Sequence, residues 1–287
     1  MTRLNWNSRP GARINPEVII NDVSINSDAA LKFVAIGAVV LAFCTTVYSE
    51  SPKPGKNEVP IRGHRQNIYF YPAEGAGNHP KILFAPGDGG WRGFAITIAQ
   101  DLAKAGYDVY GIDTLRYLKS FTGPSVLSPP EIASDFDQMA RWIQQGRRER
   151  CLLVGWSEGA GLSLAATAVA ENQTIFDGLV AIGTPEYNIL AWHWTDIGAE
   201  ITKKLPGEPT FRSADFMARV SPLPLLIIAS TSDENVTPET TRALFSEARE
   251  PKRLVIINAR DHKYSGNTEG FFRALREGVN WIQQQHQ

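Results

Sequence analysis

Ser157, which lies in the segment Gly155-Trp156-Ser157-Glu158-Gly159, is the residue of this sequence best suited to covalent chemistry. An apolar run, residues 151–154, precedes the segment, and small and apolar residues follow it. A serine at such a strand-to-helix turn has a strained backbone that raises its hydroxyl above the sheet, and the flanking glycines avoid clashes with neighbouring elements. The pattern predicts Ser157 as the nucleophile of an acyl-transfer reaction. The alternative is a tight turn with a serine helix cap.

A serine nucleophile requires a base, and in this fold the base is a histidine that follows the serine in the chain. His193 lies in an aromatic-rich interval, and His286 is adjacent to the C-terminus. His262 follows the last predicted strand, residues 253–258, by a short loop. This position predicts His262 as the residue that takes the serine proton. The alternative is an ordinary surface-loop histidine.

The acid is expected after the preceding strand, residues 223–230. Asp233 is the first carboxylate after that strand, and Glu234 is a rival beside it. We expect Asp233 to orient the imidazole of His262 and to stabilise its protonated form. Asp261 is next to His262 in the sequence and is not expected to reach its ring.

A glycine-rich turn, Pro86-Gly87-Asp88-Gly89-Gly90-Trp91, follows the predicted strand 81–85. Two backbone N–H groups must face the oxygen of a tetrahedral intermediate, one from the residue after the nucleophile and one from an earlier loop. Glu158 and Asp88 are the candidates for this oxyanion hole, with Gly89 as the next choice. The alternative is a glycine-rich turn with a helix-capping aspartate.

The elements that must position these residues alternate between strands and helices from about residue 61 onward. Apolar runs predict strands at 68–71, 81–85, 107–112, 151–154, 178–182, 223–230 and 253–258. Helical patterns lie at 93–105, 130–145, 158–170, 238–247 and 268–284. This alternation predicts an α/β fold with a mostly parallel central sheet covered by helices on both faces, and the serine turn specifies the α/β-hydrolase fold.

The interval of about 186–221 interrupts this alternation and shows no clear strand. It is rich in aromatic residues, among them Trp192. A long insert at the carboxyl end of a sheet strand is the usual position of a lid, and aromatic side chains suit an apolar part of a ligand. We therefore expect a lid that includes Trp192. The plainer alternative is a pair of helices over an apolar patch.

Composition excludes several classes of protein. The net charge of -1 provides no general attraction to nucleic acid. The two cysteines form no disulfide framework, and no Cys/His spacing suits a metal site. A phosphate-binding loop and the Rossmann glycine spacing are both absent, so no cofactor is predicted.

The N-terminal region is expected to direct export. Residues 33–48 carry no charge, and Arg and Lys residues precede them, so a transmembrane anchor or signal segment is predicted with the N-terminus in the cytoplasm. A cleaved long leader, a lipoprotein at Cys44 and a buried helix are the alternatives. Residues 1–32 are predicted to be disordered, 49–60 to be a linker and 61–287 to be the hydrolase domain.

The stretches PGDGGWRGFA, GYDVYGIDTLRYLKSFTGP, LLVGWSEGAG and ARDHKYSG resemble the bacterial virulence protein VirJ family, which includes the larger AcvB proteins. The resemblance covers roughly residues 65–285. It implies a periplasmic α/β-hydrolase that acts on aminoacylated phospholipids such as lysyl-phosphatidylglycerol, with a link to type IV secretion. It also implies that Trp91, Arg116 and Tyr117 lie near the pocket rim. The predicted substrate-binding residues are Gly89, Trp91, Tyr117 and Trp192.

The sequence departs from the family pattern at two places. It has Trp-Ser-Glu-Gly-Ala-Gly where the resemblance implies Tyr-Ser-Phe-Gly-Ala-Asp, and Asp261-His262 where it implies paired histidines. These departures concern the substrate rather than the serine chemistry. Glu158 beside the nucleophile either recognises a cationic acyl group or points to solvent.

The sequence thus predicts a periplasmic serine hydrolase of ester bonds, anchored in the inner membrane if residues 33–48 are not cleaved. Its expected partners are a small-molecule or lipid ester, the membrane through residues 33–48, and proteins of a secretion system. A non-catalytic periplasmic adaptor with the same fold is the alternative. A peptidase or thioesterase is a third hypothesis, because a fold does not determine the reaction.

Overall fold

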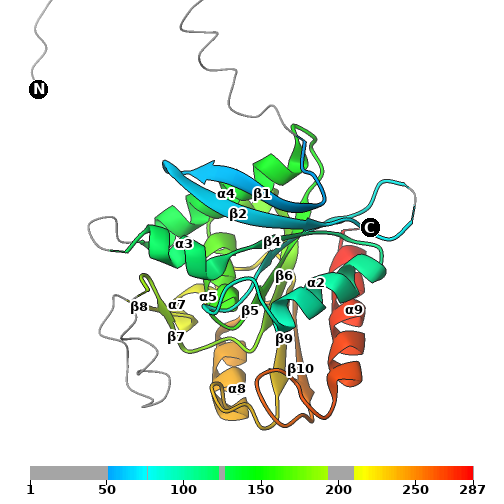
Figure 1. Cartoon of the computed structure of the whole chain (residues 1–287). Helices are drawn as coiled ribbons and strands as arrows, with labels where there is room; N and C mark the ends of the chain where they lie inside the picture. Colours follow the sequence, from blue (N-terminus) through cyan, green and yellow to red (C-terminus); the bar gives the residue numbers. More distant parts are fainter. Residues whose placement is uncertain (1–50, 76, 123–126, 193–209, 287) are drawn as a thin grey trace, which may run out of the picture. The chain divides into compact units, whose positions relative to one another are not determined.

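The computed structural model describes residues 51–75, 77–122, 127–192 and 210–286, all within the unit Glu50–Gln287 (Figure 1). The predicted disordered segment, residues 1–32, and the predicted membrane or signal segment, residues 33–48, lie outside these ranges. Within them, no helix has both the length and the apolar character needed to cross a membrane.

An eight-stranded sheet forms the centre of the fold, in the order β1-β2-β4-β3-β5-β6-β9-β10. Strands β4 to β10 of this order run parallel, whereas β1 and β2 are antiparallel to their neighbours. The strands are β1 (Gly55–Ile61), β2 (His64–Tyr71), β3 (Lys81–Ala85), β4 (Asp108–Ile112), β5 (Cys151–Trp156), β6 (Phe176–Ile182), β9 (Leu225–Ser230) and β10 (Lys252–Ile257).

Helices cover both faces of the sheet (Figure 1). Alternate residues of one strand point to opposite faces, and in β3 both sets are buried: Leu83 lies in one hydrophobic cluster and Ile82 in the other. The first cluster includes side chains of α4 (Pro129–Gln144), α5 (Glu158–Thr167) and α8 (Pro238–Glu247). The second includes side chains of α2 (Phe94–Lys104) and α9 (Thr268–Gln284).

The α/β fold with its mostly parallel sheet is confirmed. Each predicted strand overlaps an observed one, and the predicted helices correspond to α2, α4, α5, α8 and α9. Two further short elements, α3 (Thr114–Ser120) and η1 (Asn172–Thr174), were not predicted.

The predicted linker at 49–60 is wrong for its second half. Gly55–Ile61 pairs with His64–Tyr71 along its whole length to form the hairpin β1-β2. Val59 and Ile61 are fully buried, although the segment also contains Pro60, Lys56 and Glu58. An edge strand tolerates a proline, and the apolar side chains are buried only because β2 provides the partner.

The interval expected to have no clear strand contains two short ones. β7 (Tyr187–Ile189) and β8 (Thr210–Arg212) form an antiparallel pair, and α7 (Ala214–Met217) follows. Residues 193–209, the middle of the predicted lid, lie outside the described residues.

A buried carboxylate joins the β1-β2 hairpin to two helices. Asp135 of α4 is almost fully buried and accepts hydrogen bonds from the Arg62 guanidinium at 2.9 Å. It also accepts one from the Tyr117 hydroxyl of α3 at 2.7 Å. The Arg62 guanidinium lies 3.7 Å from the centre of the Phe121 ring. Because a buried carboxylate is stable only when it is paired and hydrogen-bonded, these contacts hold α3 and α4 against the hairpin.

We predict that Tyr117→Phe lowers the free energy of unfolding by about 1.5–3 kcal/mol, because it removes a hydrogen bond to a buried charged group. Tyr69→Phe is the matched control, since within the described residues the Tyr69 hydroxyl makes no hydrogen bond. Urea unfolding of both variants measures the difference. An equal, small effect in the two variants would contradict the structural role of the Tyr117 hydroxyl.

Candidate active site

Ser157 lies at the turn between β5 and α5, with a φ of 56° that non-glycine residues rarely adopt. Its N–H donates to the carbonyl of Ile182 at 2.8 Å, which fixes the turn against β6. A Cβ on Gly155 would lie 2.5 Å from the Cα of Ala160, and one on Gly159 would lie 2.0 Å from the carbonyl oxygen of Ala85. The two glycines are therefore required by close backbone approach, and together they hold the strained serine above the sheet.

Asp233 and His262 meet in a buried contact, although 29 positions separate them in the chain. Nδ1 of His262 lies 2.6 Å from Oδ2 of Asp233. Oδ1 of Asp233 accepts from the N–H groups of Asn235 and Val236 at 2.8 and 2.9 Å. The carboxylate is thus held by its own loop and presents its second oxygen to the imidazole, an arrangement that orients the ring.

Glu234, the alternative candidate for the acid, contacts the backbone of His262 rather than its imidazole ring. Its Oε2 accepts from the backbone N–H of His262 at 2.9 Å and so fixes the loop that carries the imidazole. Asp261 accepts from the N–H groups of Lys263 and Ser265, as a loop-forming residue does. Neither carboxylate has a contact with the ring among those found in the described residues.

Two further residues shape the position of the His262 ring. The indole of Trp156 stacks on it with ring centres 5.5 Å apart. A Cβ on Gly183, the residue after β6, would lie 2.6 Å from Cε1 of His262, so only glycine leaves room for the ring there. Nε2 of His262 is buried and has no hydrogen-bond partner in the part of the chain that the structure describes. The nitrogen that a general base would use is therefore available.

The glycine-rich loop after β3 lies beside Ser157. A Cβ on Gly87 would lie 3.2 Å from Cβ and 3.6 Å from Oγ of Ser157. Glu158 is the first residue of α5, so its N–H has no acceptor within the helix. Asp88 is the next residue after Gly87 in this loop. The structure thus brings the loop of Asp88 and the N-terminus of α5 to the same serine.

The side chain of Glu158 does not point to solvent. The residue is only 7% exposed, and its Oε1 accepts from the N–H of Ile189 in β7 at 3.0 Å. Burial, together with the charge of Asp88, raises the pKa of this carboxyl well above its usual value, against the opposing effect of the Ile189 N–H. Of the two alternatives for Glu158, the one in which its side chain points to solvent is therefore wrong.

Trp91 lies in an aromatic group on the sheet rather than in an open rim. Its ring is stacked on Tyr69 with centres 5.2 Å apart and covers Gly111 of β4 so closely that a Cβ there would lie 1.7 Å from it. Gly89 lies next to the Arg92 side chain, which a Cβ on Gly89 would approach to 3.2 Å. Trp91 therefore supports the glycine loop through packing.

Tyr117 is almost fully buried, and its hydroxyl is bonded to Asp135, so its predicted place at the pocket rim is wrong. The reason is that α3 turns this side chain inward, to the network that also holds Arg62. Exposed neighbours of Tyr117 on the same helix line a pocket instead.

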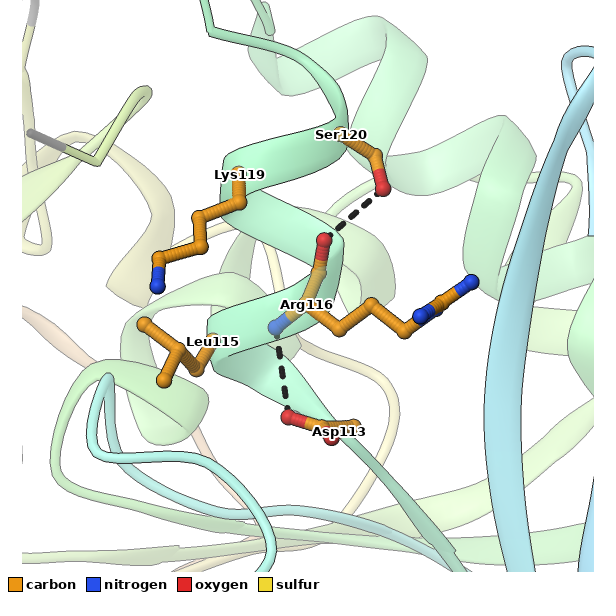
Figure 2. A pocket seen from close by; sticks show the side chains of 5 residues that line it. All are labelled: Asp113, Leu115, Arg116, Lys119 and Ser120. Carbon is orange, nitrogen blue, oxygen red and sulfur yellow. Dashed lines mark hydrogen bonds between the residues drawn. The ribbon is translucent and has the colours of Figure 1, made fainter.

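A pocket of about 420 Å³ lies along α3 and is lined by Asp113, Leu115, Arg116, Lys119 and Ser120 (Figure 2). Figure 2 shows Leu115 and Lys119 projecting to one side of the helix and Arg116 to the other. The pocket adjoins the glycine loop, because a Cβ on Gly90 would lie 2.6 Å from Oδ1 of Asp113 and 2.8 Å from Cβ of Leu115.

Trp192, predicted to bind substrate, lies beside this pocket. The ammonium group of Lys119 is 4.1 Å from the centre of the Trp192 ring. The backbone N–H of Trp192 donates to the Thr122 hydroxyl at 3.0 Å, which holds the chain after β7 against the residues that follow α3. Trp192 thus contacts Lys119, which is one of the residues that line the pocket.

Residues 81–203 match the family model described as bacterial virulence protein (VirJ). The resemblance to the VirJ family is confirmed. The matched VirJ region contains the glycine-rich loop, α3, the Ser157 turn and β7, but not Asp233 or His262.

Among curated relatives, the uncharacterized protein YfhR of Escherichia coli O157:H7 is 23% identical over 186 residues, which are 63% of this chain and 62% of YfhR. YfhR of Escherichia coli K12 matches over the same extent. The chain therefore spans less than two thirds of the length of these relatives.

Solved structures show the same fold. Est1E from Butyrivibrio proteoclasticus has a TM-score of 0.60 at 15% identity, over 79% of this chain and 98% of its own. The α/β hydrolase GrgF from Penicillium sp. sh18 has a TM-score of 0.62 at 13% identity, over 81% and 99%. A putative dienelactone hydrolase from Klebsiella pneumoniae has a TM-score of 0.59 at 16% identity, over 80% and 98%. The α/β-hydrolase fold of this chain is confirmed.

The roles of Gly183 and of the stacked Trp156 were not predicted from the sequence. The signal for Gly183 was present as Gly-Thr-Pro directly after an apolar strand, since a glycine at a strand end marks close approach of another group. Nothing in the sequence indicated that Trp156, adjacent to Ser157, would meet a ring from residue 262.

We predict that Gly183→Ala displaces the His262 ring, because the new Cβ would overlap Cε1 at 2.6 Å. NMR of the imidazole resonances, with thermal unfolding, measures this effect. Gly63→Ala is the matched control: its φ of +81° is also positive, but its Cβ would meet nothing within 4 Å. Unchanged His262 resonances in Gly183→Ala would contradict the packing described here.

Proposed function

We propose that this chain is a serine hydrolase that cleaves an ester bond by acyl transfer from Ser157 to water. The observation that carries the proposal is the 2.6 Å contact of His262 Nδ1 with Asp233. In the part of the chain that the structure describes, the buried Nε2 has no hydrogen-bond partner, and the same ring is stacked on the residue before Ser157. Catalytic hydrogen bonds are commonly long before substrate binds and tighten in the complex, so the Ser157 hydroxyl is expected to reach Nε2 then.

In this mechanism the Ser157 oxygen attacks the ester carbonyl carbon while Nε2 of His262 takes the hydroxyl proton. Asp233 stabilises the imidazolium that forms. The N–H groups of Asp88 and Glu158 stabilise the oxyanion of the tetrahedral intermediate. The intermediate collapses with loss of the alcohol, which receives the proton from Nε2. Water then hydrolyses the acyl-serine by the same steps.

The substrate is proposed to carry an anionic group near its ester. The α3 pocket adjoins the glycine loop, and on one side of α3 it presents the cationic Lys119 beside the apolar Leu115. Such a lining suits a phosphate next to an apolar part of the ligand. An aminoacyl phospholipid such as lysyl-phosphatidylglycerol, which the VirJ resemblance suggests, has this chemistry.

The proposed site of action is the periplasm. It rests on the uncharged residues 33–48, which lie outside the described residues, and on the VirJ resemblance. Anchoring in the inner membrane and association with secretion-system proteins remain proposals on the same basis. An adaptor without activity would have no need of a histidine held by a buried carboxylate, so we favour the enzyme.

We predict that Ser157→Ala lowers the turnover of a p-nitrophenyl ester by at least about 10⁴-fold with little change in thermal stability, because it removes the nucleophile. Ser246→Ala, at an exposed serine of α8, is the matched control and should keep full activity. A fluorophosphonate probe should label Ser157 and not the variant. Equal turnover in Ser157→Ala, or stable binding of envelope proteins without any labelling, would favour the adaptor.

We predict that Lys119→Gln raises KM for an anionic ester about two- to fivefold, since an exposed charge interaction has modest energy. KM for a neutral ester of the same acyl group should stay unchanged, which separates the charge from the stacking on Trp192. Lys104→Gln, at an exposed lysine of α2, controls for net charge. Equal KM shifts for both esters would contradict an anion-binding role of the pocket.

A further inference from the structure

The β7 strand is docked on the N-terminal half of α5 through two buried contacts. Ile189 donates its N–H to Oε1 of Glu158 at 3.0 Å. One residue earlier, the fully buried Asn188 packs on Gly161, where an added Cβ would lie 1.6 Å from its Oδ1. Asn188 in turn donates to the hydroxyl of Ser213 at 2.8 Å. The segment that enters the insert is therefore fixed to the same helix that begins directly after Ser157.

Glu158 is an unusual residue to make this contact, because its carboxyl group is taken out of water next to the nucleophile. Within the described residues, the charged group that faces it is Asp88, in the loop after β3, and β7 contributes the Ile189 N–H. Among the described residues, no cation opposes the carboxyl. Burial and the Asp88 charge both favour the neutral acid, and the single N–H bond opposes them.

The protonation state of Glu158 bears directly on the proposed chemistry. The backbone N–H of the same residue is the proposed donor to the oxyanion, so an ionised side chain would add negative charge close to the place where negative charge develops. A neutral carboxyl accepts the Ile189 N–H without this penalty.

We propose that Glu158 is a positioning residue that clamps β7 to the nucleophile turn and works in its protonated form. This inference rests on the proposed function, because the oxyanion belongs to that reaction. A group with a raised pKa keeps its proton into a higher pH range, so the active form is lost as the pH rises through the raised value. We therefore expect kcat/KM to fall at alkaline pH through ionisation of Glu158.

The experiment is the pH profile of kcat/KM for a p-nitrophenyl ester from about pH 6 to about pH 10, corrected for spontaneous hydrolysis. The wild type should lose about tenfold per pH unit beyond the alkaline midpoint. Glu158→Gln should remove this alkaline limb, because the amide cannot ionise and its oxygen still accepts the Ile189 N–H. Glu158→Ala leaves that buried N–H unsatisfied and should lower kcat across the whole range.

Asp88→Asn provides a second test that does not depend on altering Glu158. Removing the Asp88 charge makes ionisation of Glu158 easier, so the alkaline midpoint should move to lower pH. Fluorophosphonate labelling rates at the same pH values give an independent readout of the serine in each variant.

An alkaline limb that is identical in wild type, Glu158→Gln and Asp88→Asn would overturn the inference while leaving the hydrolase intact. A Glu158→Gln variant with a Tm close to wild type but the low kcat of Glu158→Ala would also overturn it, because conservative replacement would not have restored the contact. Absence of both turnover and labelling in the wild type would instead end the proposed function.

Discussion

The hydrogen bond between the Asp233 carboxylate and Nδ1 of His262 is the interaction on which the site depends. Burying a carboxylate costs free energy unless its oxygens are satisfied, and here two backbone N–H groups of its own loop and the imidazole satisfy them. The opposite loop is fixed as firmly. Glu234 holds the backbone of His262, and Tyr264, with a φ of 60° and no exposed surface, donates its hydroxyl to the Ile228 carbonyl at 3.1 Å. The ring therefore has little freedom to turn away.

Sheet order brings these loops together. The strands β3, β5, β6, β9 and β10 are consecutive neighbours in the parallel part of the sheet. The loops after them carry, in the same order, the glycine-rich turn, Ser157, Gly183, Asp233 and His262. Because the carboxyl ends of parallel strands meet at one edge of the sheet, the loop after each of these strands places its site residue at that edge. The glycines that border the site then set its distances, since any Cβ at Gly155, Gly159 or Gly183 would overlap a neighbour.

The described start of the insert between β6 and β9 packs on the helix that follows the Ser157 turn. Glu158 and Gly161 of α5 receive Ile189 and Asn188 of β7, and Lys119 of α3 lies on Trp192 just beyond it. These contacts place the start of the insert between the nucleophile helix and the α3 pocket. Among the described residues, no cation pairs with the buried Glu158 carboxyl, so its ionised form costs free energy. This cost is the physical reason for the proposed link between its proton and activity.

The sequence by itself determined the strand and helix alternation, the turn at Ser157 and the positions of Asp233 and His262 after their strands, because these features depend on local periodicity and on glycines in tight turns. It did not predict β1, since Val59 and Ile61 are buried only when β1 pairs with β2. It also did not predict the inward side chain of Tyr117, whose hydroxyl donates to the buried Asp135. The roles of Glu234 and Gly183 and the burial of Glu158 were decided by tertiary structure alone. Each depends on a contact between residues far apart in the chain. A local sequence pattern does not show which distant residues will be in contact in the folded protein.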